Sequence, residues 1–432
     1  MDAVCSYTLG ITKKTKGKAM KTVYTILEQI VKYIPRALVE RVANRYDCNA
    51  RNFTPFAHIV ALMTYQLGHL SSLNSVCDLA NAYENQWCNI THTTSPCRNT
   101  FSYANMTRDP KMIEDLFWAL RDHLIGTTPD FYPTQGKGFI HRFKRPIYAI
   151  DSSTIQLVLN CMDWAKHRRQ KAAAKLHLTF DVKSLLPHVA IVESAGHHDS
   201  TRAPILIESL KNGDICIADR AYLDFDFLDE LDHRGIFFVI REKQNLCTEV
   251  VKDLSEPHEL DTSSETIQIL SDQEIKPSKL KTALKYSGRL RRVKAYVEVD
   301  KQMRVMTFLT NNFAWSPRTI TELYKARWNI EIFFKEFKQT CQLQSFLGYS
   351  ENAIKWQVWS ALLVHLLLRY IAFLSKWKGS FSRLVALIRN TLWKFAKLIK
   401  FLETNGTARR RRNRRRPPPM PYIQEILLFT VR

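Results

Sequence analysis

The sequence has 432 residues, enough chain for two or three hydrophobic cores rather than one. Hydrophobic residues make up 45%, an ordinary share for a globular protein, which excludes a wholly disordered chain. The 63 Lys and Arg outnumber 41 Asp and Glu and leave a formal charge of +22. This charge favours nucleic acid as the partner over two alternatives, a protein that contacts an anionic membrane and a basic protein without a polyanionic partner.

The start of the chain is not expected to act as a signal peptide. MDAVCSYTLGITKKTKGK lacks an apolar core of the length that a signal peptide needs, and we expect residues 1–18 to be disordered. The 9 cysteines are an odd number without a Cys-x-x-Cys pair. This argues against a disulfide framework or a thiolate zinc site and fits a reduced, cytosolic compartment.

Residues 19–130 are predicted to form a helical domain that binds DNA. Apolar residues recur three and four apart in KTVYTILEQIVKYI and in FAHIVALMTYQLGHL, and a further helix, KMIEDLFWALRDHLI, follows Pro110. SPCRNTFSYANMTRD predicts a short helix that is either a recognition helix or a packing helix with a basic outer face. A loop rich in Gly, Pro and Thr, 126–138, marks the domain boundary.

After residue 139 the pattern changes to short β-branched and apolar runs bounded by turn residues. These are RPIYAIDSSTIQLVL, KLHLTFDVK, LPHVAIVES, GDICIADR and GIFFVIRE. Two helical segments, TRAPILIESLKN and DFDFLDELDHRG, separate the last three of them. Three strands followed by helix, strand, helix and strand predict an α/β layer with a mixed sheet.

The remainder of the chain alternates again between strand-like and helical patterns. Residues 242–310 contain strand-like runs, and RLRRVK within them suits either a strand lying on DNA or an edge strand protected by charge. Helical spacing returns at Ser316, and residues 346–405 are predicted to form C-terminal helices. Within them, 356–374 is predicted to be a buried helix rather than a membrane span, because His365 and Arg369 interrupt its apolar sequence. The basic tail, 406–432, carries 7 arginines in ARRRRNRRRPPP, a solvated arm that can add phosphate affinity.

Two predicted strands end on an aspartate, Asp151 in IYAID and Asp219 in ICIAD. An acid directly after a buried strand lies at the carboxyl edge of the sheet, where open α/β sheets form ligand sites. A single aspartate there is more often a turn or helix cap, and Asp181 follows LHLTF in the same way. His197 and His198 in SAGHHDST are candidate metal ligands, although a polar loop that caps the next helix is favoured.

The segment TELYKARWNIEIFFKEFKQTCQL places Tyr324, Arg327, Glu331 and Lys338 on one stripe of a predicted helix. An adjacent apolar stripe with three Phe buries the helix, which distinguishes the pattern from an ordinary surface ladder of Arg and Glu. Three carboxylates can hold two divalent ions about 3.5–4 Å apart around a phosphodiester. We therefore predict Asp151, Asp219 and Glu331 to be catalytic ligands of Mg²⁺, with Mn²⁺ a substitute, and Arg327 and Lys338 to contact phosphate.

These residues resemble a known family. The spacing Tyr-x2-Arg-x3-Glu-x6-Lys matches the YREK signature of bacterial insertion-sequence transposases of the insertion-sequence-4 type. AIDSSTIQL resembles the first-aspartate strand of that family, and ADRAY, with Arg220 and Tyr222, resembles its second-aspartate motif. FTPFAHIVALMTYQLGHLSSL is similar to the N-terminal helical domain of one branch, so the likeness covers most of residues 50–375.

The resemblance implies a ribonuclease-H-like catalytic domain over 139–345 with a β-rich insertion at about 242–310. It implies DDE cut-and-paste transposition with two Mg²⁺ ions, in which a nicked element end forms a hairpin, is reopened and joins target DNA. The implied partners are double-stranded DNA, as terminal inverted repeats and target, and a second copy of the chain, in the bacterial cytosol at the nucleoid. Tyr324, Arg220 and Tyr222 would also contact DNA.

One feature departs from the family and two other functions compete with transposition. Family members stack a flipped base on a tryptophan of the insertion, whereas 242–310 contains none, and Tyr286 and Tyr296 are the aromatic candidates. The alternatives are a stand-alone ribonuclease-H-fold DNA endonuclease and a DNA-binding descendant without catalysis. The YREK set and the additional helical domains favour transposition over the first, and the presence of all three acids argues against the second.

Overall fold

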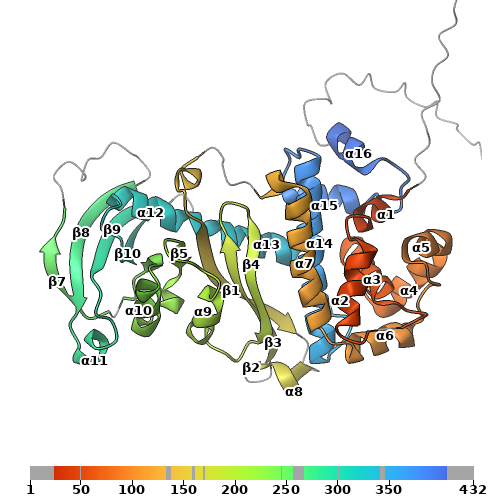
Figure 1. Cartoon of the computed structure of the whole chain (residues 1–432), viewed down its shortest axis with the longest axis horizontal. Coiled ribbons are helices and arrows are strands. Elements are labelled where there is room, and N and C mark those ends of the chain that lie inside the picture. Colours follow the sequence, from red (N-terminus) through yellow and green to blue (C-terminus); the bar gives the residue numbers. More distant parts are fainter. Residues whose placement is uncertain are drawn as a thin grey trace, which may run out of the picture.

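The computed structural model describes residues 24–48, 50–132, 138–157, 161–168, 171–244, 246–255, 267–299, 302–340 and 346–405. The predicted disordered start, 1–18, and the basic tail, 406–432, lie outside the described residues, and so do parts of the insertion. A layer of helices forms one end of the molecule and a long sheet forms the other (Figure 1).

The N-terminal helices surround α3, which is buried along nearly its whole length. The helix begins where the Thr54 hydroxyl accepts a hydrogen bond from the Ala57 N–H at 3.1 Å and Pro55 occupies the first turn. The helices of this part are α1 (Ile26–Val31), α2 (Arg36–Asn44), α3 (Pro55–Gly68), α4 (Leu73–Ala82), α5 (Glu84–Thr91), α6 (Arg98–Thr107) and α7 (Lys111–Thr127).

The C-terminal helices complete this layer. They are α14 (Glu351–Leu374), α15 (Phe381–Arg389) and α16 (Leu398–Asn405). α14 packs against α3, α6 and α7, and Figure 1 shows it beside α7. It is long and apolar enough to cross a membrane, but 78% of its most apolar window is buried inside the protein. α14 is thus a core helix, as its interrupting polar residues predicted.

The sheet has ten strands in the order β2-β3-β1-β5-β6-β10-β9-β8-β7, with β4 paired to β3. The strands are β1 (Ile147–Leu157), β2 (Lys166–Arg168), β3 (Lys171–Asp181), β4 (Leu186–Ser194), β5 (Ile215–Ala218), β6 (Phe237–Arg241), β7 (Thr248–Asp253), β8 (Ile267–Pro277), β9 (Leu290–Val299) and β10 (Gln302–Thr310). β1 is antiparallel to β3 and parallel to β5, and β5 is parallel to β6. This mixed sheet confirms the predicted ribonuclease-H-like fold class.

Helices α9 (Asp199–Ile207) and α10 (Phe225–His233) connect the parallel strands. β5 is buried on every residue, which explains why its sequence is apolar without alternation. α10 ends at His233, and Gly235, two residues later, has a φ of +66° that suits glycine. The Ile236 N–H then bonds to the Leu231 carbonyl at 2.9 Å. The chain therefore turns directly from α10 into β6. Shorter helices are η1 (Pro129–Phe131), η2 (Ile140–Arg142), α8 (Met162–Ala165), η4 (Arg220–Tyr222) and α11 (Leu280–Ala283).

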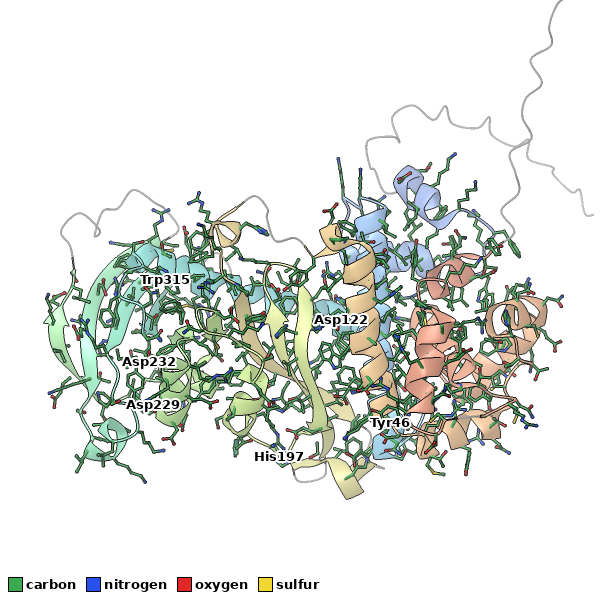
Figure 2. The ribbon with its side chains drawn as sticks, viewed as in Figure 1. Tyr46, Asp122, His197, Asp229, Asp232 and Trp315 are labelled. Atoms are coloured by element: carbon green, nitrogen blue, oxygen red, sulfur yellow. The ribbon has the colours of Figure 1, made fainter. Side chains whose placement is uncertain are left out.

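The insertion continues the central sheet, because β10 pairs with β6 through Phe308 and Arg241. β9 lies between β8 and β10, so the run RLRRVK is not at an edge of the sheet. Its arginines bind protein groups: Arg291 donates to Asp272 at 2.8 Å and to the Trp315 carbonyl at 2.6 Å. Trp315, labelled in Figure 2, lies just before α12 (Pro317–Ala326). The hydrogen bond from Arg291 to its carbonyl therefore connects β9 to the start of that helix.

Candidate active site

Asp151 and Asp219 lie where the parallel pairing of β1 with β5 ends. The prediction that a strand ends at Asp151 is wrong, because β1 continues to Leu157 and pairs with β3 over those residues. β1 and β5 are parallel with Ile150 opposite Ala218, and Asp151 and Asp219 are the residues that follow this pair. Asp181 belongs to β3, which runs antiparallel, and its position opposite Tyr148 places it at the other end of β1. Its carboxylate accepts hydrogen bonds from the N–H groups of Lys183 at 2.8 Å and Ser184 at 3.2 Å. Asp181 is therefore a turn cap away from the site.

Glu331 reaches this point from α13 (Trp328–Thr340). Arg327 connects the acids: its Nη1 donates to Asp151 Oδ2 at 3.1 Å, and its Nη2 forms an ion pair with Glu331. The guanidinium is largely buried, with 11% of the side chain exposed. Arg327 thus bridges two of the three predicted catalytic acids.

The predicted single helix through Tyr324 and Lys338 is interrupted. α12 ends at Ala326 and α13 begins at Trp328, so Arg327 lies between two helices. The Arg327 N–H bonds to the Tyr324 carbonyl three residues back, at 3.0 Å, in the tighter pattern of a 3₁₀ turn. The expectation of one straight stripe is therefore wrong at this residue, although Tyr324, Arg327 and Glu331 still line one pocket.

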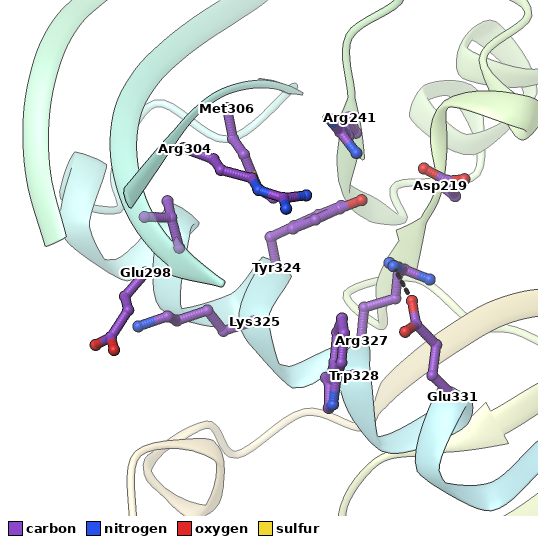
Figure 3. A pocket seen from close by; sticks show the side chains of 11 residues that line it. Asp219, Arg241, Glu298, Arg304, Met306, Tyr324, Lys325, Arg327, Trp328 and Glu331 are labelled. Carbon is purple, nitrogen blue, oxygen red and sulfur yellow. Dashed lines mark hydrogen bonds and ion pairs between the residues drawn. The ribbon is translucent and has the colours of Figure 1, made fainter. Parts of the chain in front are cut away.

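That pocket has a volume of about 680 Å³ and lies between two of the predicted acids, Asp219 and Glu331, and residues of the insertion. Figure 3 shows Asp219 opposite Arg327 and Glu331, with the Tyr324 hydroxyl directed towards Arg241. Its lining residues are Asp219, Arg241, Val297, Glu298, Arg304, Met306, Tyr324, Lys325, Arg327, Trp328 and Glu331. Arginines and a lysine from β6, β10 and α12 therefore surround the space in front of the acids.

The other predicted site residues lie around this pocket. The ring of Tyr324 packs on Phe308, with 4.7 Å between ring centroids. Lys338 donates to the Thr154 carbonyl of β1 at 2.8 Å, so in the free protein its ammonium connects α13 to β1. Arg220 is exposed in η4. Tyr222 is 1% exposed, and a direct contact with DNA would require it to move.

Burial and charge set the protonation of the site. Burial raises the pKa of Asp151 to about 6, against the lowering effect of Arg327 and of the Ser152 N–H. The pKa of Tyr222 is raised well above its ordinary value, mainly by burial and further by the negative charges of Asp199 and Asp151. Burial lowers the pKa of Lys338. A cation placed between the carboxylates would favour their ionised forms.

The donor chemistry of the site fits a hard divalent cation, because the three acids offer carboxylate oxygens. Within the described ranges, no three Asp, Glu, His or Cys side chains are already assembled to hold a metal ion. Instead, the Arg327 guanidinium lies between the carboxylates of Asp151 and Glu331 and forms an ion pair with each. The Tyr324 hydroxyl and Nε of Arg327 are buried without a hydrogen-bond partner among the described residues. Unsatisfied groups of this kind are expected where a ligand is to bind.

Several site residues escaped the sequence analysis. Trp328, Lys325, Arg241 and Arg304 line the pocket, yet only Arg241 had a signal, since it ends a predicted strand. His197 and His198 are exposed, and Figure 2 places His197 at one end of the sheet. The neighbouring Asp199 accepts a hydrogen bond from the Ser152 hydroxyl at 2.5 Å and pairs with Lys175 at 2.8 Å. SAGHHDST is thus polar and supports β1, but the expected cap of the next helix is wrong, because α9 has no side-chain hydrogen bond at its N-cap residue, His198.

Comparisons with known proteins agree with this geometry. A family model described as "Transposase DDE domain" matches residues 142–367, and a model described as a domain of unknown function matches 22–90. A probable transposase for insertion sequence element IS5377 of Geobacillus stearothermophilus is 28% identical over 53% of this chain, which spans 58% of that relative.

Two further relatives carry similar descriptions. The transposase for insertion sequence element IS231E of Bacillus thuringiensis is 24% identical over 45% of this chain and 49% of its own length. A putative transposase for insertion sequence element IS4SA of Synechocystis is 20% identical over 63% of this chain and 71% of its own length. The segment that the DDE-domain family model matches, residues 142–367, includes the strands of the sheet and the acids of the pocket.

Proposed function

The chain belongs to the DDE transposase family, and on that premise we propose that it is the DNA transposase of an insertion sequence, which cuts the ends of its element and joins them to target DNA. The observation that carries this proposal is a pocket in which Asp219 and Glu331 lie among four cations, one of which, Arg327, also binds Asp151 of β1. Phosphoryl transfer requires positioning and charge neutralisation, and both are available there.

We assign Asp151, Asp219 and Glu331 as the catalytic acids. A DDE domain uses divalent metal, and these acids would hold two Mg²⁺ ions, with Mn²⁺ able to replace them. When bound, such a pair stabilises charge on the attacking and leaving oxygens of a phosphodiester. The chain's own contribution is to hold the acids at one edge of a rigid sheet and to orient the DNA strand before them.

The cations of the pocket would bind the DNA backbone. Arg327, Arg241, Arg304 and Lys325 surround the space before the acids, where a phosphate could accept hydrogen bonds from guanidinium groups. Nε of Arg327 is free among the described residues for such a contact. Lys338 and Arg220 would add contacts at the margins, Lys338 after release of the Thr154 carbonyl. The buried Tyr324 and Tyr222 would shape the site beneath these cations.

An extruded base would have a stacking partner in Trp328. Tyr286, one of the two candidates in the insertion, is 2% exposed and belongs to a buried apolar cluster. Tyr296 on β9 is 37% exposed but does not line the pocket, whereas Trp328 is 46% exposed and lines it together with Glu331. Stacking on an aromatic face is worth about 1–3 kcal/mol per base. We therefore assign Trp328 the role that an insertion tryptophan has in related enzymes.

The remaining assignments concern the whole protein. Residues 19–130 would bind the element ends, with the exposed side of α6, which includes Arg98 and Tyr103, as a candidate surface. Residues 139–345 would form the catalytic domain and 346–405 the helices that connect it to the N-terminal part. Two copies of the chain would hold the two ends together, in the bacterial cytosol at the nucleoid.

A strand-transfer reaction tests this proposal. The full chain is incubated with Mg²⁺, a supercoiled target plasmid and a labelled duplex that carries the pre-cut element end. We expect the label to become joined to the plasmid, and an end that lacks its 3′-hydroxyl to bind without joining. Cleavage of an uncut end without any joining would identify a stand-alone endonuclease instead. Specific binding with neither reaction would identify an inactive descendant.

A further inference from the structure

Arg327 has an unusual position for a DNA-binding arginine. It bridges Asp151 of β1 and Glu331 of α13, two acids from different elements, and only 11% of its side chain is exposed. The Asp151 side chain is 22% exposed and that of Glu331 is 35% exposed, so solvent screens their negative charges only in part and a cation between them stabilises both. In the free protein the guanidinium supplies that charge at the point where the acids would bind a metal ion.

The pocket provides a second position for the same guanidinium. About 680 Å³ of space adjoins Arg327, and Arg241, Arg304 and Lys325 line that space. Besides Asp219 and Glu331, Glu298 is the one acid in that lining, so Arg241, Arg304 and Lys325 leave a net positive charge there. Without an anion this charge disfavours a fourth cation, and the guanidinium is better placed between the acids. A DNA phosphate in the pocket reverses this preference, because it attracts Arg327 to the cationic side.

We infer that Arg327 is an exchangeable counter-ion, which fills the metal position in the free protein and moves to a DNA phosphate when metal binds. This rests on the proposed function and deepens it. Because the two events share one side chain, metal and DNA each strengthen the binding of the other, as linkage requires. A metal ion without DNA must displace the guanidinium into a repulsive pocket, which keeps the site poorly loaded until an element end arrives.

Loss of Arg327 should strengthen metal binding to the free protein, because it removes a competitor. A guanidinium that merely holds the acids in place would have the opposite effect, since its loss would let the carboxylates move apart. Metal binding measured without DNA and without catalysis therefore separates the two roles.

The experiment measures Mn²⁺ binding to the full chain by electron paramagnetic resonance, for the wild type, Arg327→Gln, Arg241→Gln and Glu331→Gln. We expect Arg327→Gln to bind Mn²⁺ about tenfold more tightly than the wild type, within the range usual for coupled sites. Arg241→Gln removes the same charge from the same pocket without contact to the acids, and should gain less than about threefold. Addition of an element end that lacks its 3′-hydroxyl should tighten Mn²⁺ binding by the wild type and leave Arg327→Gln nearly unchanged.

Three results would overturn the inference: unchanged or weaker Mn²⁺ binding by Arg327→Gln, an equal gain in Arg241→Gln, or an equal effect of DNA on both proteins. Arg327→Lys, which can contact one acid but not bridge two, provides a second variant should the Gln variant fail to fold, and should have intermediate affinity. Equal Mn²⁺ affinity in the wild type and Glu331→Gln would instead reject the acids as the metal site and the proposed function with them.

Discussion

Asp151 and Asp181 look alike in the sequence, since each ends an apolar strand, yet their surroundings differ. Asp151 follows a residue of β1 that pairs with the parallel β5, which places it beside Asp219. Asp181 ends the antiparallel β3 and accepts hydrogen bonds from two backbone N–H groups of the next turn. The direction of the neighbouring strand therefore decides which aspartate can take part in chemistry.

This contrast predicts opposite effects of two similar substitutions. Asp181→Asn removes a charge that accepts these hydrogen bonds, and should lower the free energy of unfolding by about 1–3 kcal/mol while the folded protein still cleaves DNA. Asp219→Asn should abolish cleavage with little effect on stability. Urea unfolding and cleavage of a labelled element end check both. A folded Asp181→Asn protein without cleavage would contradict this assignment.

At this scale the sequence singled out the three acids, Arg327 and Lys338, but not the other cations of the pocket. A strand-end aspartate and the spacing around Glu331 are local patterns, and the structure brings all three acids to one edge of the sheet. Arg304 and Lys325 reach the pocket only because β10 pairs with β6 and α12 follows it. Such pairing joins residues that are distant in sequence, and no local pattern encodes it. Trp328 lies next to Arg327 in the motif, but nothing in the sequence around it indicated that it lines the pocket.

Among the elements, α14 holds the helix that carries Glu331. Glu336 of α13 forms an ion pair with Arg369 of α14, and the ring of His365 lies 4.9 Å from that of Phe333. On the other side of α14, Trp356 lies 4.4 Å from the ring of His58 in α3. α14 therefore connects the catalytic helix to the N-terminal helices through two buried histidines.

His58 makes this contact sensitive to acid. Burial, and then the charge of Arg108, lower the pKa of His58 to about 3, so it is neutral in the folded protein. In the unfolded chain it takes up a proton below about pH 6.5. The stability that neutral His58 contributes is therefore complete above pH 6.5 and is lost as the pH falls towards 3, at about 1.4 kcal/mol per pH unit.

Urea unfolding at pH 7.5 and pH 5.5 measures this effect in the wild type and in His58→Gln, which can keep a hydrogen bond to Asn105. The wild type should lose about 1.4 kcal/mol more than the variant between the two pH values. Burial also lowers the pKa of His177, His188 and His365. These histidines are present in both proteins, so their contribution to the loss of stability cancels in the comparison. An equal loss in both would mean that His58 is not buried in its neutral form.

The elements themselves were largely predictable, and their junctions were not. Apolar spacing predicted α3, α7, α14 and the strands of the mixed sheet, because one-sided burial imposes a period on the sequence. The break between α12 and α13 was missed, since Arg327 is a good helix former and no glycine or proline marks the site. The arginines of RLRRVK suggested either a strand lying on DNA or a charged edge strand, but Arg289 and Arg291 are bound to acids and a carbonyl of the protein.

In the whole molecule, α12 and α13 run from the insertion strands to α14 and so connect the two ends of the structure (Figure 1). The pocket lies along this connection, on the side of the insertion. The formal charge of +22 belongs to the entire chain. DNA that reaches from the N-terminal helices to the pocket would therefore contact many cations along its length.

This arrangement predicts strongly salt-dependent DNA binding. A protein that neutralises about 6–10 phosphates loses about 10³–10⁵ in affinity between 50 and 200 mM salt. Fluorescence anisotropy with an element-end duplex should give such a slope, and Arg304→Gln should reduce its magnitude by about one phosphate. Affinity independent of salt would exclude the backbone-dominated binding proposed here.

The most direct test of the central claim is cleavage of a labelled duplex carrying the element's own end, with Mg²⁺ or Mn²⁺, by the wild type and by Glu331→Gln. The substitution keeps the size of the side chain and removes the charge that would bind metal. The wild type should cut the DNA, while the variant should bind it and leave it intact, with a loss of at least about 10³ in rate. Equal cleavage by both proteins would show that Glu331 is structural and that Asp151, Asp219 and Glu331 are not the catalytic triad.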